Sequence, residues 1–147
     1  MIPIINAKRF LYKSLRQPLY AFHVLQKRAA AYLSYRADSG RSSCPESVTL
    51  FLTHRCNMRC RMCGQKHRAD GPELSLDSLK AIVDDLSTFR PSITLFGGEP
   101  MLHEGCIDLI KYIKSKGMHC LMITNALLVE ARAEDIVASG LDELNVS

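Results

Sequence analysis

The segment His54-Arg-Cys-Asn-Met-Arg-Cys-Arg-Met-Cys-Gly64 places three cysteines, Cys56, Cys60 and Cys63, in the spacing C-x-x-x-C-x-x-C. It directly follows residues 48–53, a short β-branched and apolar run that predicts a strand. Three thiolates this close together can wrap one metal cluster if the loop curls around it. Ordinary four-iron clusters use four cysteines, so three ligands leave one iron with an open position, as a catalytic metal needs.

The same loop carries positive charge. Arg55, Arg59 and Arg61 alternate with the cysteines. Cationic neighbours favour the thiolate over the thiol, and the thiolate is the form that binds metal. The loop composition therefore indicates a metal site rather than a pair of disulfides.

Cysteine usage also bears on the compartment. The three cysteines outside the loop are scattered, and they are Cys44, Cys106 and Cys120. The last two lie among apolar residues and are expected in the core. The N-terminus shows no signal-type apolar run, and no run reaches the roughly 20 residues of a membrane-spanning helix. We therefore expect a cytoplasmic chain without a membrane span, in which clustered cysteines bind metal.

From residue 47 onward the pattern alternates between strands and helices. Strands are predicted at residues 48–53, 92–96, 119–124 and 144–147, and helices after Ser75 and at residues 103–116 and 130–139. Such alternation predicts an α/β fold with a parallel sheet or barrel. Because a parallel strand is normally followed by a covering helix, a sequence that ends on a strand is expected to be a fragment of a longer protein.

A second motif, Gly97-Gly98-Glu99-Pro100, ends the second predicted strand. Paired glycines allow the backbone to approach a ligand without a Cβ clash. Glu99 offers an acceptor for an ammonium group, and Pro100 fixes the turn. Both motifs would lie at the carboxyl edge of the sheet, where barrel active sites occur.

Together the two motifs resemble the radical S-adenosylmethionine (radical SAM) superfamily, over about residues 46–147. The resemblance implies a partial (β/α) TIM-like barrel, comprising the first four of six strands. It implies that Cys56, Cys60 and Cys63 bind a [4Fe-4S] cluster whose open iron chelates S-adenosylmethionine. It also implies that the G-G-E-P segment lines the site of the methionine amino group.

Four further residues match the family more weakly. Thr124 and Asn125 stand where the superfamily often has T-N-G, with Ala126 in place of the glycine; alternatively they form an ordinary strand-to-loop turn. Ser147 matches a serine that often reaches the cofactor's ribose or carboxylate, or it is simply the last residue. Met62 stands where the family usually has an aromatic residue near the adenine, and it is a soft substitute.

The resemblance also implies the activity. An electron from the reduced cluster cleaves S-adenosylmethionine to methionine and a 5′-deoxyadenosyl radical, which abstracts a hydrogen atom from the substrate. The electron would come from an external donor such as a flavodoxin or ferredoxin. The substrate is unknown; enzymes with a similar T-H-R-C-N-M-R-C segment act on peptides or cofactor precursors.

Two other classes remain open on the residues alone. One is a structural zinc module, in which Cys44, His54 or His67 completes a set of three cysteines. The other is a non-catalytic iron–sulfur electron carrier, or a nucleic-acid-binding protein that uses the basic N-terminus. A zinc module leaves the G-G-E-P segment unexplained, and a solvated helix accounts for the basic residues without nucleic acid.

The N-terminal residues 1–43 form a separate region. Eight basic residues face one acid, Asp38, so this region has a formal charge of +7, and the rest of the chain carries −3 of the total +4. Residues 7–36 predict a basic amphipathic helical extension broken near Gln17-Pro18, and residues 37–43 a linker. The expected domains are therefore 1–43 and 44–147.

Overall fold

The computed structural model describes residues 15, 18–37, 40, 42, 44–64 and 71–147. The chain divides into two compact units, Met1–Glu46 and Ser47–Ser147. The division falls three residues beyond the boundary expected from composition. Among the described helices, none combines the length and the apolar character required to cross a membrane.

The first unit contains helix α2, Pro18–Arg36. Its start at Pro18 agrees with the break expected near Gln17-Pro18, because the first helical position does not need the N–H that proline lacks. No α2 residue is buried, and the Arg28 guanidinium pairs with the Glu46 carboxylate at 3.0 Å. The expected helical residues before Pro18, apart from Leu15, lie outside the described residues, as does part of the linker.

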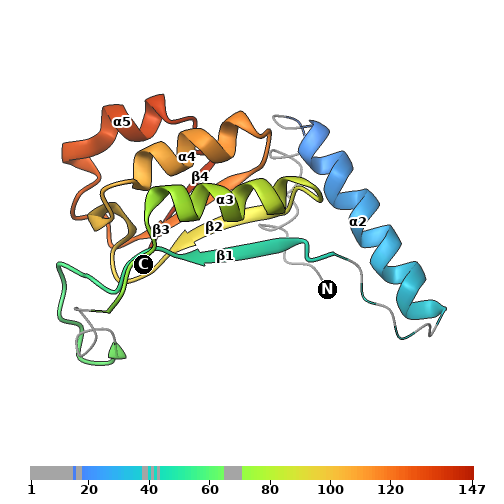
Figure 1. The fold of residues 1–147 in the computed structure, drawn as a ribbon, viewed down its shortest axis with the longest axis horizontal. Coiled ribbons are helices and arrows are strands. Elements are labelled where there is room, and N and C mark those ends of the chain that lie inside the picture. The colour runs from blue at the N-terminus through green and yellow to red at the C-terminus, as the bar shows by residue number, and fades with distance from the viewer. Residues whose placement is uncertain (1–14, 16–17, 38–39, 41, 43, 65–70) are drawn as a thin grey trace. The chain divides into compact units, whose positions relative to one another are not determined.

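The second unit is built on one parallel sheet, drawn in Figure 1. Its strands are β1 Ser47–Phe51, β2 Ser92–Phe96, β3 Cys120–Thr124 and β4 Glu143–Val146, in the order β1-β2-β3-β4. Every neighbouring pair is parallel. The α/β prediction is confirmed, and each strand lies within one or two residues of its expected bounds.

Three helices cover the same face of this sheet (Figure 1). They are α3 Leu76–Ser87, α4 Cys106–Ser115 and α5 Ala133–Ala138. As expected, Ser75 caps α3, and its hydroxyl accepts a hydrogen bond from the Ser78 N–H at 3.2 Å. The core lies between sheet and helices and includes Ile93, Leu95, Cys120 and Met122.

Side chains on the other face of the sheet are exposed or half-buried. Phe51 and Phe96, paired across β1 and β2, are 37% and 40% exposed, and their ring centroids lie 6.0 Å apart in an edge-to-face arrangement. Successive strand residues point to opposite faces, so the buried alternate positions all face the helices.

Two helix predictions were too long. A 3-10 turn, η2 Pro100–Leu102, precedes α4, because His103 adopts an extended backbone (φ −76°, ψ 123°) that separates the two. Similarly, the 3-10 turn η3 Glu130–Arg132 precedes α5, and Arg132 (φ −120°, ψ 16°) departs from helical geometry. The first predicted helix therefore began three residues before the observed start of α4 at Cys106, and the second predicted helix included η3.

Candidate metal and cofactor site

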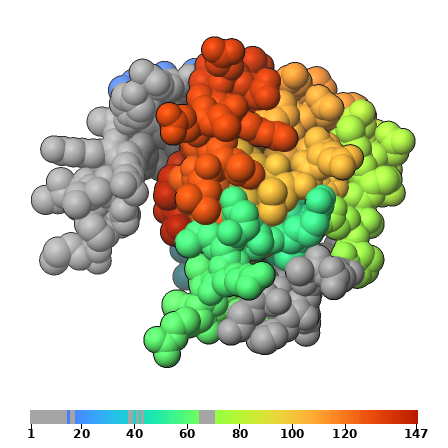
Figure 2. All heavy atoms as spheres, turned by 90° about the vertical axis from the view of Figure 1, so that its left-hand side faces the viewer, coloured from blue at the N-terminus to red at the C-terminus, as the bar shows by residue number. Residues whose placement is uncertain are grey.

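The carboxyl ends of β1, β2 and β3 lie along one edge of the sheet. Figure 2 views this edge and shows the cysteine loop, in green, projecting from the body below the segments that follow β2 and β3. Backbone pairing continues past the strands, since the Leu52 N–H donates to the Phe96 carbonyl at 2.9 Å. The two predicted motifs are therefore neighbours in space.

The three loop cysteines are free thiols near or at the surface. Cys56 is half-buried, and Cys60 and Cys63 are exposed. The Met58 N–H lies 3.4 Å from the Cys56 sulfur, and the Cys63 N–H donates to the Cys60 carbonyl at 3.2 Å. Within the described part of the chain, no three metal-ligating side chains are gathered at one point, so the assignment of the cluster ligands stays a prediction.

Gly97 and Gly98 pack tightly against the chain's own backbone. A Cβ on Gly97, whose φ is +154°, would lie 2.7 Å from the Thr53 carbonyl oxygen, and one on Gly98 would overlap the Arg55 carbonyl. The Gly98 N–H donates to the Thr53 carbonyl at 2.8 Å. The glycines thus allow the end of β2 to contact the start of the cysteine loop.

The carboxylate of Glu99 is completely buried. It accepts hydrogen bonds from the Thr124 hydroxyl at 2.9 Å, the Asn125 N–H at 2.9 Å and the Met101 N–H at 3.2 Å. Both oxygens are therefore engaged by the chain itself. In this arrangement Glu99 joins β2 to β3, and its expected role as an acceptor for an ammonium group stays a prediction.

Asn125 connects the end of β3 to the cysteine loop. Its side-chain N–H₂ donates to the side-chain amide oxygen (Oδ1) of Asn57 at 2.8 Å and lies 3.9 Å from the Cys56 sulfur. Its side-chain oxygen accepts from the Leu127 N–H at 3.0 Å, which closes an Asx turn. Ala126 within that turn has φ +66°, a conformation that glycine adopts more readily.

The remaining predicted cofactor residues differ in their surroundings. Pro100 is buried and begins η2. Met62 is 97% exposed. Ser147 follows β4, and its N–H donates to the Thr124 carbonyl at 3.1 Å, so it lies at the same sheet edge. Their cofactor contacts stay predictions.

Of the three candidates for a fourth zinc ligand, His54 belongs to the described part of the second unit. The His54 ring packs on Phe51, with ring centroids 4.8 Å apart, and Cys44 belongs to the first unit. His67 lies outside the described residues.

An ion pair that the sequence did not suggest borders the loop. The guanidinium of Arg55 binds the Glu73 carboxylate through Nε at 2.8 Å and Nη2 at 3.0 Å, and the Thr53 hydroxyl donates to the same carboxylate. The hydrogen bond from Arg55 holds the pKa of Glu73 below its ordinary value, and the bond to Glu73 raises the pKa of Arg55. In the sequence, the one feature that pointed to a role for Arg55 was its position next to Cys56.

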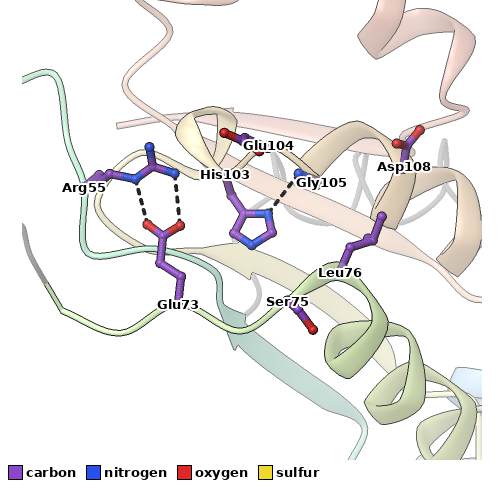
Figure 3. Close-up of a pocket in the computed structure, with 8 residues that line it drawn as sticks. All are labelled: Arg55, Glu73, Ser75, Leu76, His103, Glu104, Gly105 and Asp108. Atoms are coloured by element: carbon purple, nitrogen blue, oxygen red, sulfur yellow. Dashed lines mark hydrogen bonds and ion pairs between the residues drawn. The ribbon is translucent and has the colours of Figure 1, made fainter.

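Arg55 and Glu73 line an open pocket of about 570 Å³, shown in Figure 3. His103 lies at its centre, where its Nδ1 accepts from the Gly105 N–H at 3.2 Å. Its Nε2 therefore carries the proton and donates to the Leu74 carbonyl at 2.9 Å. The histidine is thus a link between η2 and the segment before α3.

Residues 50–147 match the family model described as "Radical SAM superfamily". The chain belongs to the radical SAM superfamily. The matched residues include both motifs and all four strands except the start of β1. The resemblance inferred from the sequence is thereby confirmed.

Several curated radical SAM relatives are similar to this chain. It is 35% identical over 100 residues to Fe-coproporphyrin III synthase of Methanosarcina barkeri, covering 65% of this chain and 25% of the relative. It is 32% identical over 111 residues to GTP 3′,8-cyclase of Rhodopirellula baltica, covering 69% and 31%. It is 30% identical over 107 residues to PqqA peptide cyclase of Bradyrhizobium diazoefficiens, covering 70% and 28%. The chain thus spans between a quarter and a third of the length of these relatives.

A solved structure supports the fold. BtrN in complex with AdoMet and 2-DOIA aligns with a TM-score of 0.64 at 19% identity, over 72% of this chain and 46% of that chain. At this identity the likeness concerns the fold alone. The parallel sheet with helices on one face is therefore consistent with part of a TIM-like barrel.

Proposed function

We propose that this chain is a radical SAM enzyme whose Cys56, Cys60 and Cys63 hold a [4Fe-4S] cluster and whose neighbouring strand ends bind S-adenosylmethionine. The observation that carries the proposal is the contact between the two motifs. The Glu99 N–H donates to the Arg55 carbonyl at 2.8 Å, directly before the first cysteine of the loop. A cofactor held by G-G-E-P would therefore lie beside the cluster loop.

The donor set suits an iron–sulfur cluster. Three thiols on one exposed loop are soft ligands of the kind that such clusters require, and a set of three leaves one iron for another ligand. Because the sulfurs are not gathered in this conformation, we propose that the loop closes as it binds the cluster.

A cluster held by Cys56, Cys60 and Cys63 would supply one-electron reduction of S-adenosylmethionine, which would give methionine and a 5′-deoxyadenosyl radical for hydrogen abstraction from the substrate. The chain's own residues orient the cofactor. A carboxylate has about four lone-pair sites, and three donors contact that of Glu99, so Gly97, Gly98 and Glu99 are together proposed to line the site of the methionine amino group. We assign Thr124, Asn125 and Ser147 to the same edge of the cofactor, and Met62 to its adenine.

We propose a peptide or a cofactor precursor as the substrate class. The names of the similar proteins support it, since they include a peptide cyclase, a GTP cyclase and an Fe-coproporphyrin III synthase. The electron donor is proposed to be an acidic one-electron carrier such as a flavodoxin or ferredoxin, because the exposed Arg59 and Arg61 would attract it. Thiol ligands of this kind support a cytoplasmic, reducing compartment.

Turnover of the cofactor tests the proposal. The chain is reconstituted anaerobically with iron and sulfide, reduced with dithionite and given S-adenosylmethionine, and 5′-deoxyadenosine is measured by mass spectrometry. We expect a brown protein that forms 5′-deoxyadenosine, and a Cys60→Ala variant that binds no cluster and forms none. A colourless protein that retains zinc would support the structural zinc module, and a brown intact parent protein that forms no 5′-deoxyadenosine would support an electron carrier.

A further inference from the structure

The Arg55–Glu73 pair joins the two ends of the cysteine loop. Arg55 immediately precedes Cys56, and Glu73 lies two residues before Ser75, the residue that caps α3. The guanidinium contacts the carboxylate at two points, 2.8 Å and 3.0 Å. All three loop cysteines therefore lie within a segment that one ion pair closes.

The pair is anchored on the sheet as well. The Thr53 hydroxyl donates to Glu73 and accepts from the Arg55 N–H at 2.9 Å. Thr53 is 1% exposed and lies just beyond β1. Its position is fixed by the core, so it holds both partners of the pair against the end of that strand.

Arg55 also contacts the segment after β2 through both its side chain and its backbone. Its Nη2 donates to the Leu102 carbonyl at 2.8 Å, and its own carbonyl accepts from the Glu99 N–H at 2.8 Å. Arg55 thus connects the start of the cysteine loop with Glu73 at its other end and with the G-G-E-P segment.

We propose that Arg55 and Glu73 are positioning residues that fix the cysteine loop against the G-G-E-P segment, so that cluster and cofactor meet at a set distance. That the loop holds a cluster rests on the proposed function. The ion pair between the two ends of the loop follows from the contacts of these two side chains.

The geometry of the pair explains why arginine is needed. A guanidinium offers a planar fork for a carboxylate and a further N–H for a carbonyl, whereas lysine offers a single point of charge. The side chains are 46% and 24% exposed, and pairs so accessible contribute little to global stability. Their loss should therefore alter the loop more than the fold.

The test uses the reconstituted chain and its Arg55→Lys, Glu73→Gln and double variants. The KM for S-adenosylmethionine and kcat are measured from 5′-deoxyadenosine formation, together with iron content and far-UV circular dichroism. We expect wild-type circular dichroism and a KM raised roughly tenfold in each single variant, as for other residues that orient metal ligands. The double variant should be no worse than the poorer single one, because both changes remove one interaction. Loss of the cluster with unchanged circular dichroism would also support the proposal.

Asp84→Asn is the matched control, since Asp84 pairs with Lys116 at 2.5 Å, away from the loop. The proposal is overturned if KM in both single variants stays within about twofold of wild type, or if the control raises KM equally. It is also overturned if both variants lose their far-UV signal, because the pair would then hold the fold rather than the loop. A wild-type chain that takes up no iron would instead refute the proposed function.

Discussion

The hydroxyl of Thr124 lies 2.9 Å from both carboxylate oxygens of Glu99, in an environment where the two residues are 1% and 0% exposed. This contact joins the carboxyl ends of β2 and β3. It also places the next residue, Asn125, beside Cys56. One buried carboxylate thus links the ends of β2 and β3.

Glu99→Gln should destabilise the second unit by about 3 kcal/mol, because the amide N–H₂ would face either the Met101 N–H or the Asn125 N–H, which are both donors. Urea unfolding followed by circular dichroism measures the loss. Glu104→Gln is the control: Glu104 is exposed, and its replacement should change stability by no more than about 0.5 kcal/mol. Equal effects of the two substitutions would show that the Glu99 contacts carry no stability.

Gly98→Ala should destabilise the chain by about 3 kcal/mol, because the new methyl group would overlap the Arg55 carbonyl and push the cysteine loop away. Gly64→Ala adds the same methyl group where no atom lies within 4 Å. The difference between their urea midpoints isolates the clash. A Gly98→Ala variant as stable as Gly64→Ala would contradict the close packing of β2 against the loop.

Sequence reasoning predicted the sheet because each strand is a short apolar run between turn signals. It predicted the proximity of the motifs because parallel strands end at one edge. It did not predict the role of the Glu99 carboxylate. A glutamate in a loop is expected to be exposed. Its burial follows from its contacts with Thr124 and Asn125, which are distant in sequence and adjacent only in the folded chain.

Ala126→Gly should stabilise the chain by about 0.5–1 kcal/mol. Ala126 has φ +66°, and glycine adopts this conformation without the steric strain of a Cβ. Glycine also increases the entropy of the unfolded chain, but this destabilising effect is smaller than the strain that is relieved. Ala81→Gly, at an exposed position inside α3, should instead destabilise it by about 1 kcal/mol. Thermal unfolding of the two variants compares them directly. A destabilised Ala126→Gly variant would argue against the left-handed turn.

The core cysteines should resist alkylation. Burial raises the pKa of Cys106 and of Cys120 to about 12 each, so at pH 8 neither is a thiolate or accessible. Mass spectrometry of the metal-free, reduced chain after iodoacetamide should find modification only at the other four cysteines, and at all six in urea. Native labelling of Cys106 or Cys120 would refute their place in the core.

The Arg55–Glu73 pair shows a second limit of sequence reasoning. Eighteen positions separate the partners, and neither belongs to a helix or strand. No periodicity links two loop residues across such a gap. Their association depends on where the loop returns to the sheet, which only the fold defines.

The most direct test of the three-cysteine site is electron paramagnetic resonance of the reconstituted, dithionite-reduced chain with and without S-adenosylmethionine. We predict a [4Fe-4S]⁺ signal that changes when S-adenosylmethionine is added, because the cofactor ligates the iron that no cysteine holds. An unchanged signal, or a chain that binds no iron, would contradict the account.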